Sequence, residues 1–91
     1  MKNNLLDKIT ELNSLYKCYL IIENSSDLTQ DAAVFGKLAL YEKMIEVLKS
    51  DIVYPIVSKN IQYPFEDSIY HVVDDTPGFL NELNKSLANN Q

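Results

Sequence analysis

The longest amphipathic pattern in the chain runs from Asp27 to Ile52. Apolar residues recur there at alternating spacings of four and three, which places them on one stripe of an α-helix. The pattern predicts a helix over residues 27–53, with Ser26 or Asp27 as N-cap and Gln30 completing a capping box. The stripe consists of Val34, Leu38, Tyr41, Ile45, Leu48 and Ile52.

A second pattern of the same kind precedes it and predicts a helix over residues 4–23. Asn3 or Asn4 can cap its start, and Asp7 lies in the first turn, where the helix dipole favours an acid. Cys18 falls beside the stripe, and we expect it to be a small buried apolar residue. The polar connection over residues 24–27 is short, so the two helices are predicted to form an antiparallel hairpin. The stripe of this first helix contains Leu5, Ile9, Leu12, Tyr16 and Tyr19.

Small residues are concentrated in the first half of the second helix. Gly36 costs about 1 kcal/mol relative to alanine inside a helix. It either lets another helix approach closely or acts as a hinge, and the close approach is the favoured interpretation. The other small residues of this stretch are Ala32, Ala33 and Ala39.

The chain after Ser50 gives weaker signals. Pro55 pushes the residue before it toward extended geometry, so the second helix should end by Tyr54. Residues 55–63 are compatible with a short helix opened by Pro55 or with an edge strand, and irregular or short helical structure is the favoured interpretation.

Two further helices are predicted in the C-terminal third. Pro64 followed by two acids indicates a short helix over residues 64–74, although residues 68–73 alone would also fit a strand. Thr76 as N-cap and Pro77 at the first helical position predict a last helix over residues 76–88.

These elements predict one mostly α-helical domain over residues 1–91. An antiparallel αα-hairpin would be covered by one or two short C-terminal helices. The alternative is an α+β fold with a small β-element in residues 52–73. The apolar stripes of both long helices are wide enough to predict further helix–helix burial, including in a homodimer.

The stretch from Gly36 to Leu48 carries a resemblance. Its glycine, the following alanine and tyrosine and the apolar-charged run read Gly-Lys-Leu-Ala-Leu-Tyr-Glu-Lys-Met-Ile-Glu-Val-Leu. Together with the first helix, over residues 5–49, it resembles small helical-hairpin proteins encoded by phages and mobile elements of Gram-positive bacteria. The resemblance implies a small interaction or regulatory protein, and it points to no particular partner and no catalytic residue.

Charge and composition exclude several functions. The chain has 91 residues, a formal net charge of −5, and eight lysines without any arginine. Arginine is the usual residue for bidentate phosphate and guanine contacts, so nucleic-acid and anionic-membrane binding are disfavoured. The N-terminus lacks the pattern of a signal peptide, no window has the length of a membrane span, and the single cysteine fits a reducing compartment. We therefore expect a cytoplasmic protein.

Candidate catalytic chemistry is sparse. His71 is the only histidine, and together with Asp67, Asp74 or Asp75 it makes a poor metal site. A Ser-His-Asp arrangement could be assembled from Ser68, His71 and Asp75, but the sequence has no nucleophile-elbow motif to support it. We expect no cofactor, no metal and no enzymatic activity.

An aromatic and acidic surface is the candidate binding site. Tyrosine is enriched in protein interfaces because it combines a large area with a polar tip. The alternative is that these aromatic residues complete the core under the hairpin. The candidate residues are Tyr54, Tyr63, Phe65, Glu66, Asp67, Tyr70, Asp74 and Asp75.

Three functional hypotheses follow. The first is a non-enzymatic inhibitor or accessory protein that occludes a basic site on a host protein, as an anti-defence protein of a phage would. The second is an intracellular immunity protein against a toxin or bacteriocin. The third is a DNA-associated regulator, which the absence of arginine disfavours.

Overall fold

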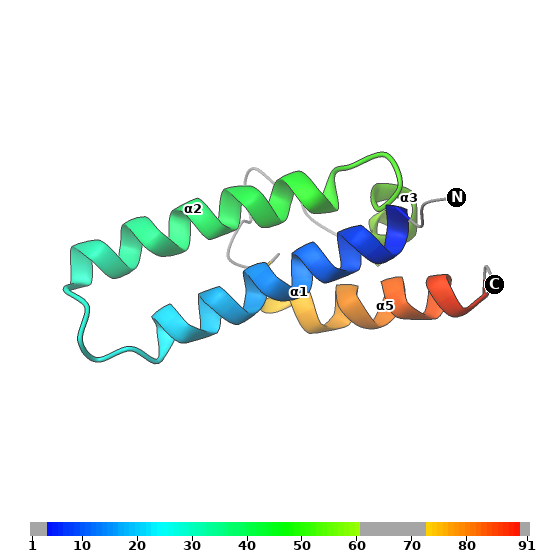
Figure 1. Cartoon of the computed structure of the whole chain (residues 1–91). Helices are drawn as coiled ribbons and strands as arrows, with labels where there is room; N and C mark the ends of the chain where they lie inside the picture. The colour runs from blue at the N-terminus through cyan, green and yellow to red at the C-terminus, as the bar shows by residue number, and fades with distance from the viewer. Residues whose placement is uncertain (1–3, 61–72, 90–91) are drawn as a thin grey trace.

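An antiparallel pair of long helices forms the frame of the molecule, and a C-terminal helix lies beside it (Figure 1). The computed structural model describes residues 4–60 and 73–89. None of these residues forms a strand, so the mostly α fold is confirmed and the β alternative is wrong for residues 52–60. The elements are α1 (Asn4–Glu23), α2 (Gln30–Leu48), α3 (Tyr54–Val57), the 3₁₀ turn η1 (Ser58–Asn60) and α5 (Thr76–Asn89).

The start of α2 differs from the prediction. The helix begins at Gln30, and its N-cap is Thr29 rather than Ser26 or Asp27. Thr29 has the extended backbone of an N-cap, and its Oγ1 accepts a hydrogen bond of 3.2 Å from the backbone N–H of Ala32. Because threonine fills the cap, the connection between α1 and α2 is longer than the sequence indicated.

The end of α2 also comes earlier than predicted, at Leu48 instead of residue 53. The Ser50 hydroxyl donates a hydrogen bond of 2.6 Å to the Val47 carbonyl, and the Ser50 backbone N–H donates to the same oxygen. A serine that binds the preceding turn in this way competes with helix continuation. Pro55 then lies in the first turn of α3, so the short-helix interpretation of this segment is confirmed over Tyr54–Asn60.

The hydrophobic core lies at one end of the hairpin. It is built from the N-terminal half of α1, the C-terminal half of α2, α3 and α5. The buried residues are Leu5, Ile9, Leu12, Tyr41, Met44, Val47, Leu48, Val53, Val57, Val73, Phe79 and Leu83.

Gly36 lies against the side chain of Ile22 on α1. A Cβ placed on Gly36 would lie 3.0 Å from Cδ1 of Ile22, the end of a flexible side chain. This contact supports packing against α1, rather than a hinge, at this position.

Two other sequence expectations need correction or completion. Cys18 is exposed, because it lies outside the apolar stripe of α1 rather than within it.

The Asp75 carbonyl accepts the first hydrogen bond of α5, from Phe79, so the cap position is Asp75 and not Thr76. Thr76 is instead fully buried. Of the predicted helix over residues 64–74, Val73 and Asp74 are helical and residues 64–72 lie outside the described residues.

Candidate functional site

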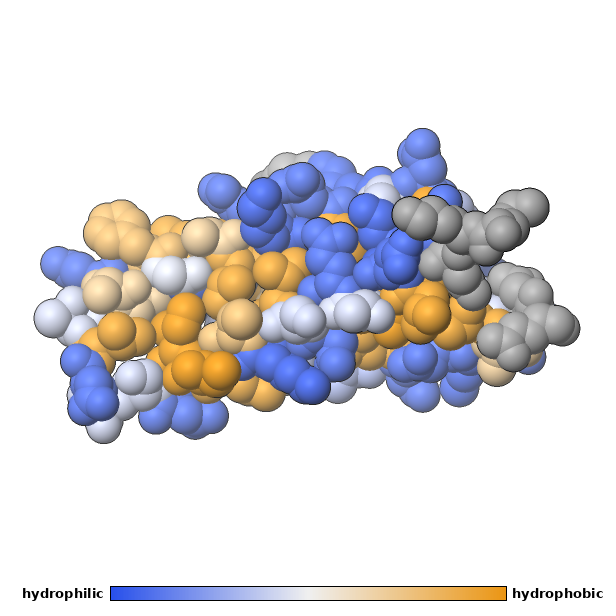
Figure 2. Space-filling model, viewed as in Figure 1, coloured by the Kyte–Doolittle hydropathy of each residue, from blue (hydrophilic) through white to orange (hydrophobic). Residues whose placement is uncertain are grey.

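The free end of the hairpin carries a cluster of exposed apolar side chains (Figure 2). They come from the last turn of α1, the connection and the first turns of α2, and their exposed fractions range from 37% to 71%. We call this cluster the hairpin-end patch. It consists of Leu20, Ile21, Leu28, Val34, Phe35 and Leu38.

Part of the patch continues the stripe that forms the core. On α2, Tyr41 is 3% exposed, while Leu38 and Val34, one and two turns earlier on the same stripe, are 37% and 46% exposed. Tyr41 packs against Tyr19 on α1, and α5, which lies along the N-terminal half of α1, does not extend to the free end of the hairpin (Figure 1). The apolar stripe of α2 therefore continues beyond its buried part.

The surface of the patch is hollowed next to the core. A depression of about 130 Å³ is lined by Val34, Lys37, Leu38 and Tyr41. Its walls are mostly aliphatic and aromatic, with one lysine. Such a surface suits an apolar side chain of a partner better than a polar ligand.

Four residues connect the two helices beside this depression, and we call them the Tyr19 cluster: Tyr19, Glu23, Lys37 and Tyr41. Nζ of Lys37 lies 2.8 Å from Oε2 of Glu23, and it also lies 5.9 Å from the centroid of the Tyr19 ring. The Tyr19 and Tyr41 rings pack with their centroids 5.7 Å apart. The cluster therefore holds α2 against α1 where α5 no longer covers them.

The environment of the Tyr19 cluster shifts two pKa values. Burial raises the pKa of Tyr19 well above its ordinary value, and hydrogen bonds with the Glu23 carboxylate and with Tyr41 add to the effect. The hydrogen bond from Lys37, followed by that from the Tyr19 hydroxyl, lowers the pKa of Glu23. The cluster therefore favours an ionised Glu23 and a neutral Tyr19, and its role is structural.

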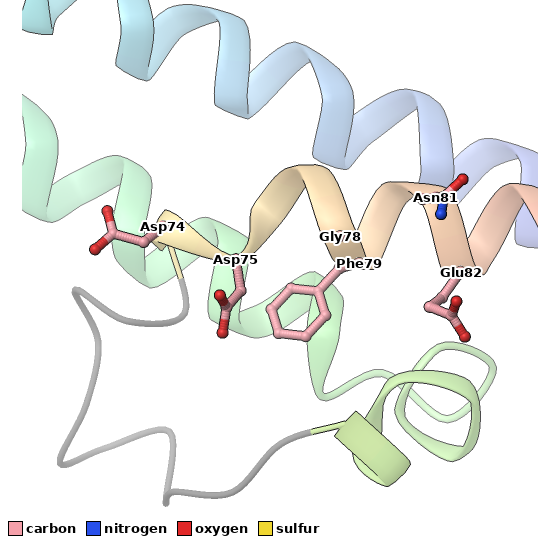
Figure 3. Close-up of a pocket in the computed structure, with 6 residues that line it drawn as sticks. All are labelled: Asp74, Asp75, Gly78, Phe79, Asn81 and Glu82. Atoms are coloured by element: carbon pink, nitrogen blue, oxygen red, sulfur yellow. The ribbon is translucent and has the colours of Figure 1, made fainter.

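A second candidate surface is an acidic groove along the start of α5 (Figure 3). The groove has a volume of about 420 Å³, and three carboxylates lie along it, with Phe79 between them in the sequence. Its described lining residues are Asp74, Asp75, Gly78, Phe79, Asn81 and Glu82. Oε2 of Glu82 lies 3.6 Å from Nζ of Lys85. This exposed ion pair neutralises part of the negative charge of the groove.

The structure describes three of the predicted binding residues. Asp74 and Asp75 are exposed and both line the acidic groove, and Asp75 caps the start of α5, where the macrodipole favours an acid. Tyr54 is 45% exposed in the first turn of α3 and is not among the described residues that line the groove. The other predicted residues, Tyr63, Phe65, Glu66, Asp67 and Tyr70, lie outside the described residues.

The predicted catalytic candidates contribute no described site. Ser68 and His71 lie outside the described residues, as does Asp67. Over residues 4–60 and 73–89, no three histidine, cysteine, aspartate or glutamate side chains come close enough together to hold a metal ion. Within the same ranges, no helix has the length and apolar character needed to cross a membrane.

Sequence reasoning missed the hairpin-end patch, although one signal was present. Leu20, Ile21 and Ile22 are consecutive apolar residues at the end of a helix. Consecutive residues are about 100° apart around a helix, so they cannot all face the same side. Ile22 packs toward Gly36, and Ile21 is left 69% exposed.

Comparison with known proteins does not assign a family. No family model matches the chain, and no significant match was found among curated proteins or solved structures. The function is therefore argued from the surfaces of the molecule.

Proposed function

We propose that this chain is a non-enzymatic protein-binding protein and that the hairpin-end patch is its main binding surface. The observation that carries the proposal is the exposure of six large apolar side chains at one end of the hairpin. Together they expose on the order of 500 Å², in the upper part of the roughly 300–600 Å² covered by the largest apolar patch of a typical monomer.

The arrangement of the patch also supports binding. The Tyr19 cluster fixes α1 and α2 relative to each other, so the apolar side chains are presented on a rigid pair of helices. A rigid surface loses little conformational entropy when a partner binds. The depression beside Tyr41 offers a place for one anchoring side chain.

The test is affinity capture with matched variants from cells of the organism that encodes the protein. Leu38→Glu places a charge in the patch, and Ile52→Glu is the control, because Ile52 is equally exposed but lies after α2. We expect a protein, a copy of this chain included, to be retained by the wild type and by Ile52→Glu but lost with Leu38→Glu. Equal capture by all three forms would reject the patch as the binding surface.

The acidic groove favours a second, more specific candidate function. In this hypothesis the chain is an inhibitor or accessory protein, as in phages and mobile elements, that occludes a basic site on a host protein. The clustering of Asp74, Asp75 and Glu82 along one groove supports a basic partner.

Charge reversal tests this second candidate. Asp74→Lys combined with Asp75→Lys should lower the association rate with a basic partner and weaken the dependence of that rate on salt. Glu46→Lys is the matched control, since Glu46 is an exposed acid on α2 outside the groove. A partner that binds the double variant as fast as the wild type would exclude the groove as its site.

A further inference from the structure

We propose that the partner on the hairpin-end patch is a second copy of this chain, so that two hairpins pack about a two-fold axis with their free ends side by side. The inference rests on the proposed function, because it identifies the occupant of the same surface. It differs from that function in predicting that the purified chain alone completes the interface.

The first argument is the continuity of the patch with the core. The α2 stripe passes from buried Tyr41 to exposed Leu38 and Val34 without a change of face. On α1, Leu20 follows Tyr16, which packs against the core, by four residues and so lies on the same face. A partner that packs on this exposed part of the stripes therefore needs an apolar surface about two helical turns long. The same stripes of a second hairpin have that character, and two antiparallel hairpins then form a four-helix arrangement.

The second argument is the area. A standard specific interface buries about 800 Å² on each partner. The six exposed apolar side chains total on the order of 500 Å², and those that continue the stripes, Leu20, Val34 and Leu38, supply the part of this area that lies on the face continuous with the core. The polar side chains around the patch supply the remainder. In a two-fold pair each copy contributes the identical patch, so a single apolar surface is sufficient for both sides of the interface.

The third argument is the charge around the patch. Glu23 and Lys37 pair with each other within one copy, and the other charges near the patch are Lys17 on α1, Asp27 in the connection and Asp31 on α2, so both signs occur on this border. A strongly basic or strongly acidic partner would meet like charges on part of this border. A second copy has the same mixture, and a two-fold rotation allows acids of one copy to face lysines of the other.

The shape of the molecule agrees with this pairing. The radius of gyration is 13.8 Å and the extents are 45 × 27 × 18 Å. A compact domain of this length has a radius of gyration of about 12 Å. The excess length lies in the free half of the hairpin (Figure 1), and pairing of two free halves would bury the part of the chain that its own core does not reach.

The decisive experiment is the mass of the purified full chain in solution, measured by light scattering and sedimentation velocity over a wide range of concentration. We expect the wild type and Ile52→Glu to approach twice the chain mass of 10.4 kDa. Leu38→Glu should raise the dissociation constant by at least about tenfold, because each substitution enters a two-fold interface twice. Val34→Glu is a second patch variant, and circular dichroism verifies that each variant keeps its helices.

Each outcome bears on a different statement. A wild type that stays monomeric at every concentration overturns the self-association, and so does a dimer that Leu38→Glu and Val34→Glu leave intact. If the wild type is monomeric but Leu38→Glu alone abolishes capture of another protein, the inference is wrong and the proposed function holds. If the wild type is monomeric and the patch variants also capture partners normally, both are wrong.

Discussion

Nζ of Lys37 on α2 lies 2.8 Å from Oε2 of Glu23 on α1, and this ion pair joins the two helices of the hairpin near its free end. Glu23 also accepts a hydrogen bond from the Tyr19 hydroxyl. The contact is therefore part of a small network rather than an isolated surface pair. Networks of this kind contribute more to stability than single exposed pairs do.

The first prediction concerns this ion pair. In a double-mutant cycle of Glu23→Gln and Lys37→Met, the double variant should be less destabilised than the sum of the single variants, as measured by urea unfolding. The coupling should decrease in about 1 M salt, where the screening length is about 3 Å. It should also decrease as the pH falls below 4.5, the ordinary pKa of Glu23, because the pKa is lowered in the folded state.

Lys43 and Glu46 provide the control for that cycle. Their charged atoms are 3.9 Å apart and both side chains are well exposed on α2. Their coupling should be close to zero. Equal coupling for the two pairs would show that the network around Glu23 adds nothing to the ion pair.

The second prediction concerns stability at alkaline pH. Burial raises the pKa of Tyr19 above its ordinary value of 10.0, so the folded chain keeps a proton that the unfolded chain loses. The contribution of Tyr19 is complete below pH 10 and is lost above it, by up to about 1.4 kcal/mol per pH unit. Tyr19→Phe should unfold with a smaller alkaline loss than the wild type. Between about pH 6 and pH 9, where Glu23 is ionised in both proteins, the pH dependence should be parallel, and parallel curves above pH 10 as well would contradict the assignment.

The third prediction concerns Gly36. Gly36→Ala should stabilise the chain by about 0.5 kcal/mol, because alanine gains about 1 kcal/mol of helix propensity and only the flexible end of Ile22 must move. The gain should be larger in an Ile22→Val background, which removes the Cδ1 atom that lies 3.0 Å from the new methyl group. Chemical denaturation measures both values. A loss of stability for Gly36→Ala in both backgrounds would show that the backbone of α1 also blocks the position.

The fourth prediction concerns the cap of α2. Thr29→Ala should destabilise the chain by about 1 kcal/mol, because the Ala32 backbone N–H loses its acceptor. Ser26→Ala is the control, since Ser26 lies in the connection before the cap. Thermal unfolding of both variants distinguishes the two positions. A larger loss of stability for Ser26→Ala would indicate that Ser26 is the N-cap of α2, as the sequence suggested.

The hairpin could be predicted from the sequence because its signals are local and repeated. The stripe from Leu5 to Tyr19 and the stripe from Val34 to Leu48 each indicate a helix. The inward face of α2 was predicted only in part, because Met44 and Val47 are buried beside Tyr41 and Leu48. The residues at which the helices begin and end were harder to predict from the sequence. Thr29, Ser26 and Asp27 are all good N-caps, and the choice depends on how far the connection must reach.

The hairpin-end patch could not be predicted, because exposure depends on what covers a stripe and not on the stripe itself. Val34 and Leu38 have the same spacing and residue type as the buried part of the stripe. Their exposure depends on which other elements pack on the hairpin, and α5 packs on α1 and α3 without extending to the free end. Asp74 and Asp75 are the converse case, since the sequence placed both in an acidic binding surface and the structure has both exposed.

The partial cover by α5 also divides the hairpin into two parts with different local stability. Backbone amides under α5, such as that of Leu12, can exchange with solvent only when the core opens, whereas those near Phe35 need only the ends of two helices to fray. The helix ends can therefore fray while the Tyr19 cluster keeps α1 and α2 together and the core stays folded. Amide exchange should then divide into a slow class under α5 and a fast class at the free end.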